Sequence, residues 1–199
     1  MMKYSVVFVL VCFNIVVGQT SSKVGVEPEI NIHAVAPIHF GDNYLSKANN
    51  PDVGFAVNLM LAQFQKIKLG LGYDYLNYLV TDISKAGNYQ NSRYHSVYGI
   101  LAYDIKFSKE LFLEPYVGLG SVNLKFKDRN RSFGEQSGMD FRIGCKGNYS
   151  FDRTISAFVG VGYVATKYDV HTNPEFVSFY DNSKMLQLIV GLRFNLYNK

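Results

Sequence analysis

The chain has 199 residues, enough for one domain, and its formal net charge at pH 7 is only +4. So mild an excess of positive charge gives no reason to expect nucleic acid as a partner. Of its two cysteines, Cys12 lies in a leader that we expect to be removed, so Cys145 has no partner for an internal disulfide. This excludes a disulfide-stapled secreted scaffold.

Residues 1–18, MMKYSVVFVLVCFNIVVG, have the pattern of a secretory signal peptide. Lys3 precedes an apolar core, Val6–Phe13, and compact residues follow it at a suitable cleavage site. The alternative, a transmembrane helix, is disfavoured because the apolar run is too short to cross a bilayer. We therefore expect a signal peptide over 1–18, a mature chain that starts at Gln19, and one domain over 19–199.

The rest of the chain alternates apolar residues with polar or small ones, which indicates strands that have two different faces. In the last segment Leu186, Leu188, Val190, Leu192, Phe194 and Leu196 form a wholly apolar row. Such a strand, tilted by about 40°, rises about 25 Å, the height of a transmembrane barrel's apolar band. Eight segments fit this pattern: Val24–Val35, Asp52–Ala62, Lys66–Val80, Arg93–Ile105, Leu111–Phe126, Gly138–Tyr149, Thr154–Thr166 and Met185–Tyr197.

The connections between these segments alternate in length. The long, polar ones are 36–51, 81–92, 128–137 and 167–183, and the short ones are 63–65, 107–110 and 150–153. Outer-membrane barrels have short periplasmic turns, long external loops and both termini in the periplasm. The sequence therefore predicts an all-β fold, an eight-stranded antiparallel up-and-down transmembrane β-barrel.

In such a barrel the uniformly apolar face must meet lipid and the mixed face must line the lumen. Buried charges have to pair, because each unpaired one would cost several kcal/mol. We expect Arg142 and Arg193 to pair with Glu27, Glu29 or Glu114. An eight-stranded barrel is just wide enough for side chains to fill, so we expect no open pore. The predicted polar lumen network is Glu27, Glu29, Lys66, Lys68, Asp74, Asp104, Glu114, Asp140, Arg142, Lys146 and Arg193, and the predicted outward aromatic girdle is Tyr73, Tyr75, Tyr103, Tyr163 and Tyr197.

The signal peptide, the segment LFLEPYVGLG (Leu111–Gly120) and the terminal LIVGLRFNLY (Leu188–Tyr197) resemble the single-domain, porin-like, eight-stranded outer-membrane barrels of Gram-negative bacteria. The resemblance implies an outer-membrane location and a monomer in contact with lipid and lipopolysaccharide. The terminal strand resembles the signal read by the barrel-insertion machinery. The family implies a location and a fold, not one activity.

Several motifs suggest chemistry, but none is specific. Gly160–Ala165 matches a loose dinucleotide fingerprint, yet a loop follows where a helix is needed, so we expect no cofactor. His95 and Ser96 are adjacent on a strand and should point to opposite faces. We expect Cys145 to be an inert outward thiol. His33, His39 and His171 have no metal-ligand spacing and are expected to be solvated loop residues near the external rim. For the pair Arg129 and Arg131 in the third external loop two interpretations stay open, contact with lipopolysaccharide phosphates and ordinary solvated loop charges.

Three functions remain open from the sequence. The first is a non-enzymatic outer-membrane barrel that serves surface binding or envelope integrity. The second is a lipid-modifying enzyme of the lipid A acylase or deacylase type, which needs a His, a Ser and a carboxylate that converge near the rim. The third is a secreted lipocalin-like barrel, which would reverse the two faces.

Overall fold

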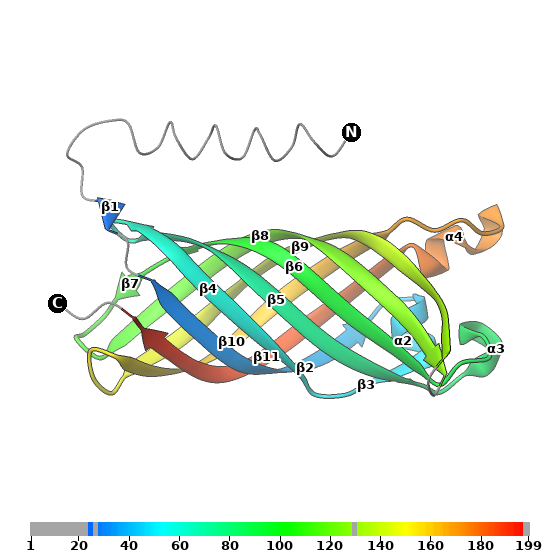
Figure 1. Cartoon of the computed structure of the whole chain (residues 1–199), viewed down its shortest axis with the longest axis horizontal. Helices are drawn as coiled ribbons and strands as arrows, with labels where there is room; N and C mark the ends of the chain where they lie inside the picture. Colours follow the sequence, from blue (N-terminus) through cyan, green and yellow to red (C-terminus); the bar gives the residue numbers. More distant parts are fainter. Residues whose placement is uncertain (1–23, 26–27, 129–130, 197–199) are drawn as a thin grey trace.

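A computed structural model describes residues 24–25, 28–128 and 131–196 of the chain, and Figure 1 shows a closed barrel with short turns at one end and helices at the other. Every neighbouring pair of strands is antiparallel, and the pairing of β4 with β5 closes the circle. The eight barrel strands are β2 (Glu29–Phe40), β4 (Gly54–Phe64), β5 (Ile67–Val80), β6 (Asn91–Tyr103), β8 (Leu111–Asp128), β9 (Arg131–Ser150), β10 (Ile155–Tyr168) and β11 (Asn182–Asn195). The predicted fold class is confirmed.

Short elements complete the two ends of the barrel. At the end that carries the short turns, here the turn end, β1 (Val24–Gly25) pairs with β4 and β7 (Ile105–Lys106) pairs with β8. At the other end, here the loop end, β3 (Asn49–Pro51) pairs with β5. The loop end also carries α2 (Tyr44–Ala48), α3 (Ile83–Ala86) and α4 (Pro174–Tyr180) (Figure 1). Within the described residues, none of these helices has the length and apolar character to span a bilayer.

The strands differ from the predicted ones mainly at the loop end. β2 runs on to Phe40, so the first part of the predicted loop 36–51 is strand, because Ile38 and Phe40 continue the outward apolar row. β9 begins at Arg131, so most of the predicted loop 128–137 is strand as well. There the β8–β9 ladder continues in spite of polar side chains, because backbone groups make its hydrogen bonds.

Two of the three loop-end helices have side-chain caps that explain where they begin. The Asn43 side chain accepts a hydrogen bond from the Ser46 N–H at 3.0 Å and starts α2. The Asp82 side chain accepts one from the Ser84 N–H at 3.0 Å and starts α3. Hydrogen bonds from Lys85 and Ser84 also lower the pKa of Asp82 to about 2.

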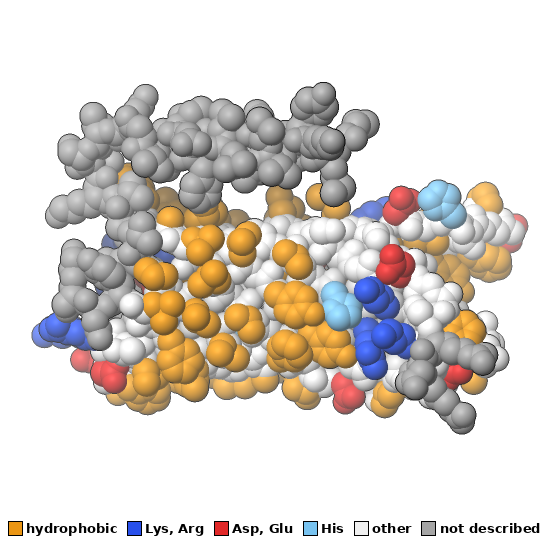
Figure 2. Space-filling model, viewed as in Figure 1, with side chains coloured by type: hydrophobic (Ala, Val, Ile, Leu, Met, Phe, Trp, Pro, Cys, Tyr) orange, Lys and Arg blue, Asp and Glu red, His pale blue; other side chains and the backbone are white. Residues whose placement is uncertain are grey.

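The two faces of the barrel are reversed relative to those of a soluble protein. Outward Leu119 and Leu188 are 62% and 51% exposed, whereas inward Glu114 and Arg193 are 0% and 1% exposed. Figure 2 shows the outward apolar side chains as a broad belt across the visible face of the barrel. A lipocalin-like barrel would have the opposite arrangement, so that hypothesis is wrong.

Lys66 is an exception to the predicted inward set. It lies in the two-residue turn between β4 and β5 and is exposed, because the strand begins only at Ile67. Its neighbour Gln65 has φ +56°, a left-handed conformation that helps to make this turn tight. The predicted signal peptide, with Glu27, Arg129 and Tyr197, lies outside the described residues, and the signal peptide stays a prediction.

Candidate functional site: a lumen plugged in three layers

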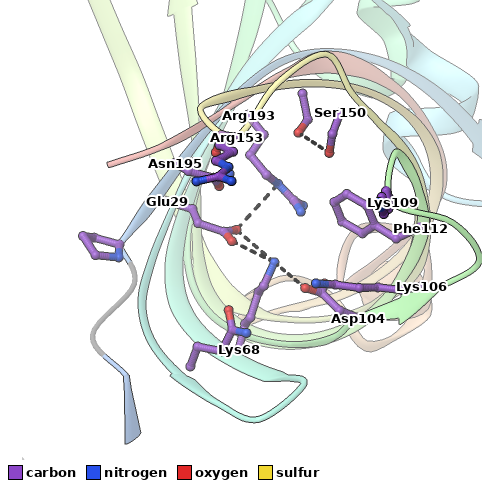
Figure 3. Close-up of a pocket in the computed structure, with 13 residues that line it drawn as sticks. Glu29, Lys68, Asp104, Lys106, Lys109, Phe112, Ser150, Arg153, Arg193 and Asn195 are labelled. Atoms are coloured by element: carbon purple, nitrogen blue, oxygen red, sulfur yellow. Dashed lines mark hydrogen bonds and ion pairs between the residues drawn. The ribbon is translucent and has the colours of Figure 1, made fainter. Parts of the chain in front are cut away.

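The layer nearest the turn end is a cluster of ion pairs around Lys68. Its Nζ lies 2.8 Å from Glu29 Oε1, 2.8 Å from Asp104 Oδ2 and 3.5 Å from Glu114 Oε2. Figure 3 shows Glu29, Lys68 and Asp104 converging from different parts of the wall on the interior of the barrel. The ammonium group of Lys68 therefore links three carboxylates that are distant from one another in the sequence.

Glu114, on β8, is the acceptor that this layer shares. Arg193 Nη2 lies 2.6 Å from its Oε2, and Lys146 Nζ lies 3.6 Å from its Oε1. Arg193 Nε also lies 3.6 Å from Glu29 Oε2 and 3.0 Å from Asn31 Oδ1. Three carboxylates and three cations thus balance in this layer, which limits the cost of burying them.

The middle layer is built around Arg142, which lies on β9. Its Nη1 donates to Asp74 Oδ2 at 2.8 Å, and its Nη2 contacts Asp140 Oδ2 at 2.5 Å. The guanidinium lies over the Tyr98 ring, 3.4 Å from its centroid, and the Tyr98 hydroxyl donates to Asp74 Oδ1 at 2.8 Å. Arg142 therefore pairs with two aspartates and not with the glutamates that the sequence suggested.

Glycines make room for these large groups. A Cβ on Gly72 would lie 2.2 Å from the Tyr98 ring, and one on Gly118 would lie 2.8 Å from Cγ of Arg142. Both distances are too short for real contacts, so an alanine at either place would push the ring or the guanidinium aside. The polar packing in the lumen therefore requires small residues at these inward positions.

The third layer, at the loop end, is apolar, which sequence reasoning missed. Tyr44, Leu45 and Ala48 of α2 are buried inside the mouth of the barrel against Leu76 and Met185. The signal was present in the sequence: Asn43 followed by Tyr-Leu-Ser-Lys-Ala is a capped helical turn inside a segment that we interpreted as a polar loop.

The histidines lie apart and do not form one rim cluster. His33 is buried in the lumen against the Phe158 ring, with 5.6 Å between the ring centroids. His39 Nε2 lies 3.0 Å from the Tyr78 hydroxyl. Both were predicted to be solvated loop residues, and that prediction is wrong because β2 carries them as barrel residues. His171 has a side chain that is 91% exposed, as expected of a loop residue.

The other sequence motifs likewise do not assemble a reaction centre. Ser96 Oγ is buried and donates to Asp140, while His95 faces outward and its Nδ1 lies 2.8 Å from the Tyr73 hydroxyl. Gly160–Ala165 lies within β10 and not at a strand-to-helix turn. Cys145 is half-buried and is not in a disulfide. Within the described ranges, no group of three His, Cys, Asp or Glu residues is placed to hold a metal ion.

A basic patch on the outer wall was also missed. Arg93 on β6 and Lys125 on β8 are direct cross-strand partners on the outward face, and Lys127 is paired with Asn91 one step nearer the loops. Figure 2 shows cationic side chains and a histidine gathered at one edge of the apolar belt. The strand register, counted from the sequence, would have revealed this patch.

These features define the protein as an integral membrane β-barrel with a plugged lumen. The apolar belt faces lipid, and ion pairs, aromatic rings and a helix fill the interior.

Comparison with solved structures gives the particular fold. The crystal structure of Neisserial surface protein A (NspA) is similar to this chain with a TM-score of 0.61 and 12% identity, over 87% of this chain and 99% of that chain. The solution structure of outer membrane protein H (OprH) from P. aeruginosa in DHPC micelles gives 0.50 and 14%, over 85% and 99%. No protein-family model matches the chain, and no curated protein sequence matches it. The predicted resemblance to eight-stranded outer-membrane β-barrels is confirmed at the level of the fold.

Proposed function

We propose that the protein is a non-enzymatic outer-membrane barrel that is closed to solutes and serves the envelope through its wall and its external loops. The observation that carries this proposal is the lumen, which is filled by an ion-pair layer, the Arg142 layer and the apolar cap of α2. The His–Ser pair that the sequence offered for the lipid-modifying alternative does not converge, because Ser96 Oγ donates to Asp140 in the lumen while His95 faces outward toward Tyr73.

Conductance across a planar bilayer tests the closed lumen. The refolded protein should give no steady conductance at neutral pH, because side chains occupy the cross-section at each layer. A general porin, inserted into the same membrane as a positive control, verifies that an open channel would be detected. Stable, single-sized current steps from this protein would overturn the closed-lumen proposal.

The basic patch supports lipid phosphate as a partner of the wall. Like charges directly opposite each other on a sheet are destabilising, and an anion between Arg93 and Lys125 would relieve that repulsion. Arg93 Nε is moreover buried without a hydrogen-bond partner among the described residues. The patch borders the lipid-facing belt, where the phosphates of lipopolysaccharide would lie.

Vesicles with and without phosphorylated lipid A test this partner. Lipid A that carries its phosphates should raise the urea midpoint of unfolding more than dephosphorylated lipid A does. Arg93→Gln with Lys125→Gln should abolish that difference, whereas Lys106→Gln with Lys109→Gln removes the same charge at the turn end and should keep it. An equal gain in both variants would contradict the proposed site.

We also propose that the barrel acts as a monomer and is inserted by the barrel-insertion machinery. Each of the eight barrel strands is paired on both sides, so no open strand edge of the barrel invites a second copy. The outward apolar row that begins at Leu186 in β11 and ends at Leu196, just after the strand, supplies the terminal-strand pattern. Light scattering in detergent tests the first point, because a stable dimer would double the protein mass.

A further inference from the structure

The turn end of the barrel opens into a cavity of about 370 Å³, here the vestibule. Its floor is the ion-pair layer, and one side of its wall is the Phe112 ring, with Arg193 and Lys68 at 5.1 and 5.7 Å from the ring centroid. Figure 3 looks into the vestibule and shows the Arg193 and Lys68 side chains reaching its centre. The cavity is large enough for a small organic ion.

The mouth of the vestibule carries positive charge that nothing in the described structure neutralises. Lys106, Lys109 and Arg153 line it, and none of them has a carboxylate within 4.0 Å among the described residues. In Figure 3 Lys106 and Lys109 lie on one side and Arg153 lies on the other. The carboxylates that line the cavity are Glu29 and Asp104, and Lys68 already engages both.

The acidic residues of the neighbouring turns are also engaged. Asp152 Oδ1 accepts hydrogen bonds from the N–H groups of Thr154 and Ile155 at 2.6 and 2.8 Å. Glu110 Oε2 accepts one from Ser108 Oγ at 3.1 Å. These carboxylates stabilise their own turns and do not line the vestibule, so they reduce its positive potential without filling it.

Donors in the wall and floor could satisfy an anion directly. Ser150 and Ser156 line the vestibule from neighbouring strands with their hydroxyl oxygens 3.0 Å apart, and only one hydroxyl proton can occupy that contact. Arg193 Nη1 is buried and has no hydrogen-bond partner among the described residues. Hydroxyl and guanidinium groups are the donors that carboxylates and phosphates prefer.

We propose that the vestibule binds a small oxyanion with two or more negative charges, the chemistry shared by phosphate esters and polycarboxylates. Among the described residues, five cationic side chains and two carboxylates line the cavity, and its low-dielectric walls concentrate their potential. A single carboxylate or a neutral sugar would leave most of the rim charge unpaired. Because the vestibule opens on the side of the short turns, the ligand enters from the periplasm if the barrel has the usual orientation.

Isothermal titration of the refolded barrel in neutral detergent tests the site with three probes. Inorganic phosphate and citrate should bind with one-to-one stoichiometry and a Kd of about 1 mM or tighter, and glucose should not bind. Comparison of the Kd of phosphate with that of citrate shows whether the vestibule prefers a phosphate or a carboxylate ligand. Amide chemical shifts should move at Ser150 and Ser156 and not in the loop-end helices.

Matched double variants decide whether the binding belongs to the vestibule. Lys109→Gln with Arg153→Gln removes two rim charges and should weaken anion binding at least tenfold. Lys47→Gln with Lys184→Gln removes two exposed charges at the loop end and should leave the Kd within twofold. Heat-modifiable gel migration verifies that both variants fold, and Lys106→Gln alone provides a milder second test.

Three results would overturn the proposal: no binding at millimolar anion, equal weakening in both double variants, or shifts confined to the loop end. The second result would show a general effect of net charge and no defined site. None of these results bears on the conductance test, so the vestibule proposal and the closed-lumen proposal fail separately.

Discussion

At the scale of single residues, Glu114 is the central acceptor of the ion-pair layer, a role that no sequence pattern suggested. It accepts from Arg193 and lies within 4 Å of Lys68 and Lys146, and it is fully buried. In the sequence it is one polar residue in the row Leu-Phe-Leu-Glu-Pro. Its importance comes from the closure of the barrel, which brings β5, β9 and β11 around one carboxylate.

Glu114→Gln should destabilise the barrel by about 3–5 kcal/mol, the usual effect of removing one member of a buried ion cluster. The reason is that three cations would share two carboxylates, and the neutral amide would replace a carboxylate at a fully buried position. Urea unfolding in lipid vesicles measures the change. Glu110→Gln, at an exposed position in the turn just before the same strand, should stay within about 0.5 kcal/mol of the unaltered protein.

At the scale of elements, the face of a strand on which a glycine lies decides whether a larger side chain would fit there. Inward Gly72 of β5 lies against the Tyr98 ring of β6, whereas a Cβ on outward Gly99 of β6 would meet nothing nearer than the Leu119 carbonyl oxygen, at 4.0 Å. Composition shows only that glycine is abundant. Register decides which glycines are required.

Gly72→Ala should therefore lower the free energy of unfolding by about 1–3 kcal/mol, because the new methyl group displaces Tyr98 from Asp74. Gly99→Ala should be neutral or slightly stabilising, because it adds apolar surface toward lipid. Urea unfolding compares the two variants. A larger loss at Gly99 than at Gly72 would mean that the assigned inward face of these strands is wrong.

The short helix α3 should respond to acid in a predictable way. Its cap, Asp82, has a pKa lowered from 3.8 to about 2, so the carboxylate binds protons less readily in the folded loop than in an unfolded one. The stabilisation is complete above about pH 4 and is lost as the pH falls through 2. Amide hydrogen exchange at Ala86 should accelerate over that range. In Asp82→Asn the exchange should show no such step once the intrinsic pH dependence is removed.

At the scale of the whole molecule, the barrel reverses the arrangement of a soluble protein, because its apolar side chains face outward and its charged side chains face inward. Its exposed apolar belt, which would promote aggregation in water, is the surface that holds it in a membrane. Its buried charges are tolerated because six of them balance in one layer and Arg142 is held by two aspartates and an aromatic ring.

A charge placed on the belt should therefore be penalised according to its depth. Leu188→Arg, on β11 opposite Ala36 and Val161, should destabilise the barrel in vesicles by about 2–4 kcal/mol. Leu196→Arg, at the turn end of the same row, should cost about 0–1 kcal/mol. Reversible unfolding from lipid vesicles measures both. Equal costs at the two positions would contradict the transmembrane placement of the belt.

The sequence alone determined the number of strands, their inward and outward faces and the membrane solvent, because a strict period of two is local information that survives without knowledge of contacts. It also placed charged residues such as Glu29, Lys68 and Arg193 on the inward face. Only the tertiary structure decided that Arg142 pairs with Asp74 and Asp140, that α2 plugs the mouth and that Lys106, Lys109 and Arg153 line one cavity without a carboxylate partner among the described residues. Those outcomes depend on the shear and closure of the barrel, which set the neighbours of each inward side chain across strands that are far apart in the chain.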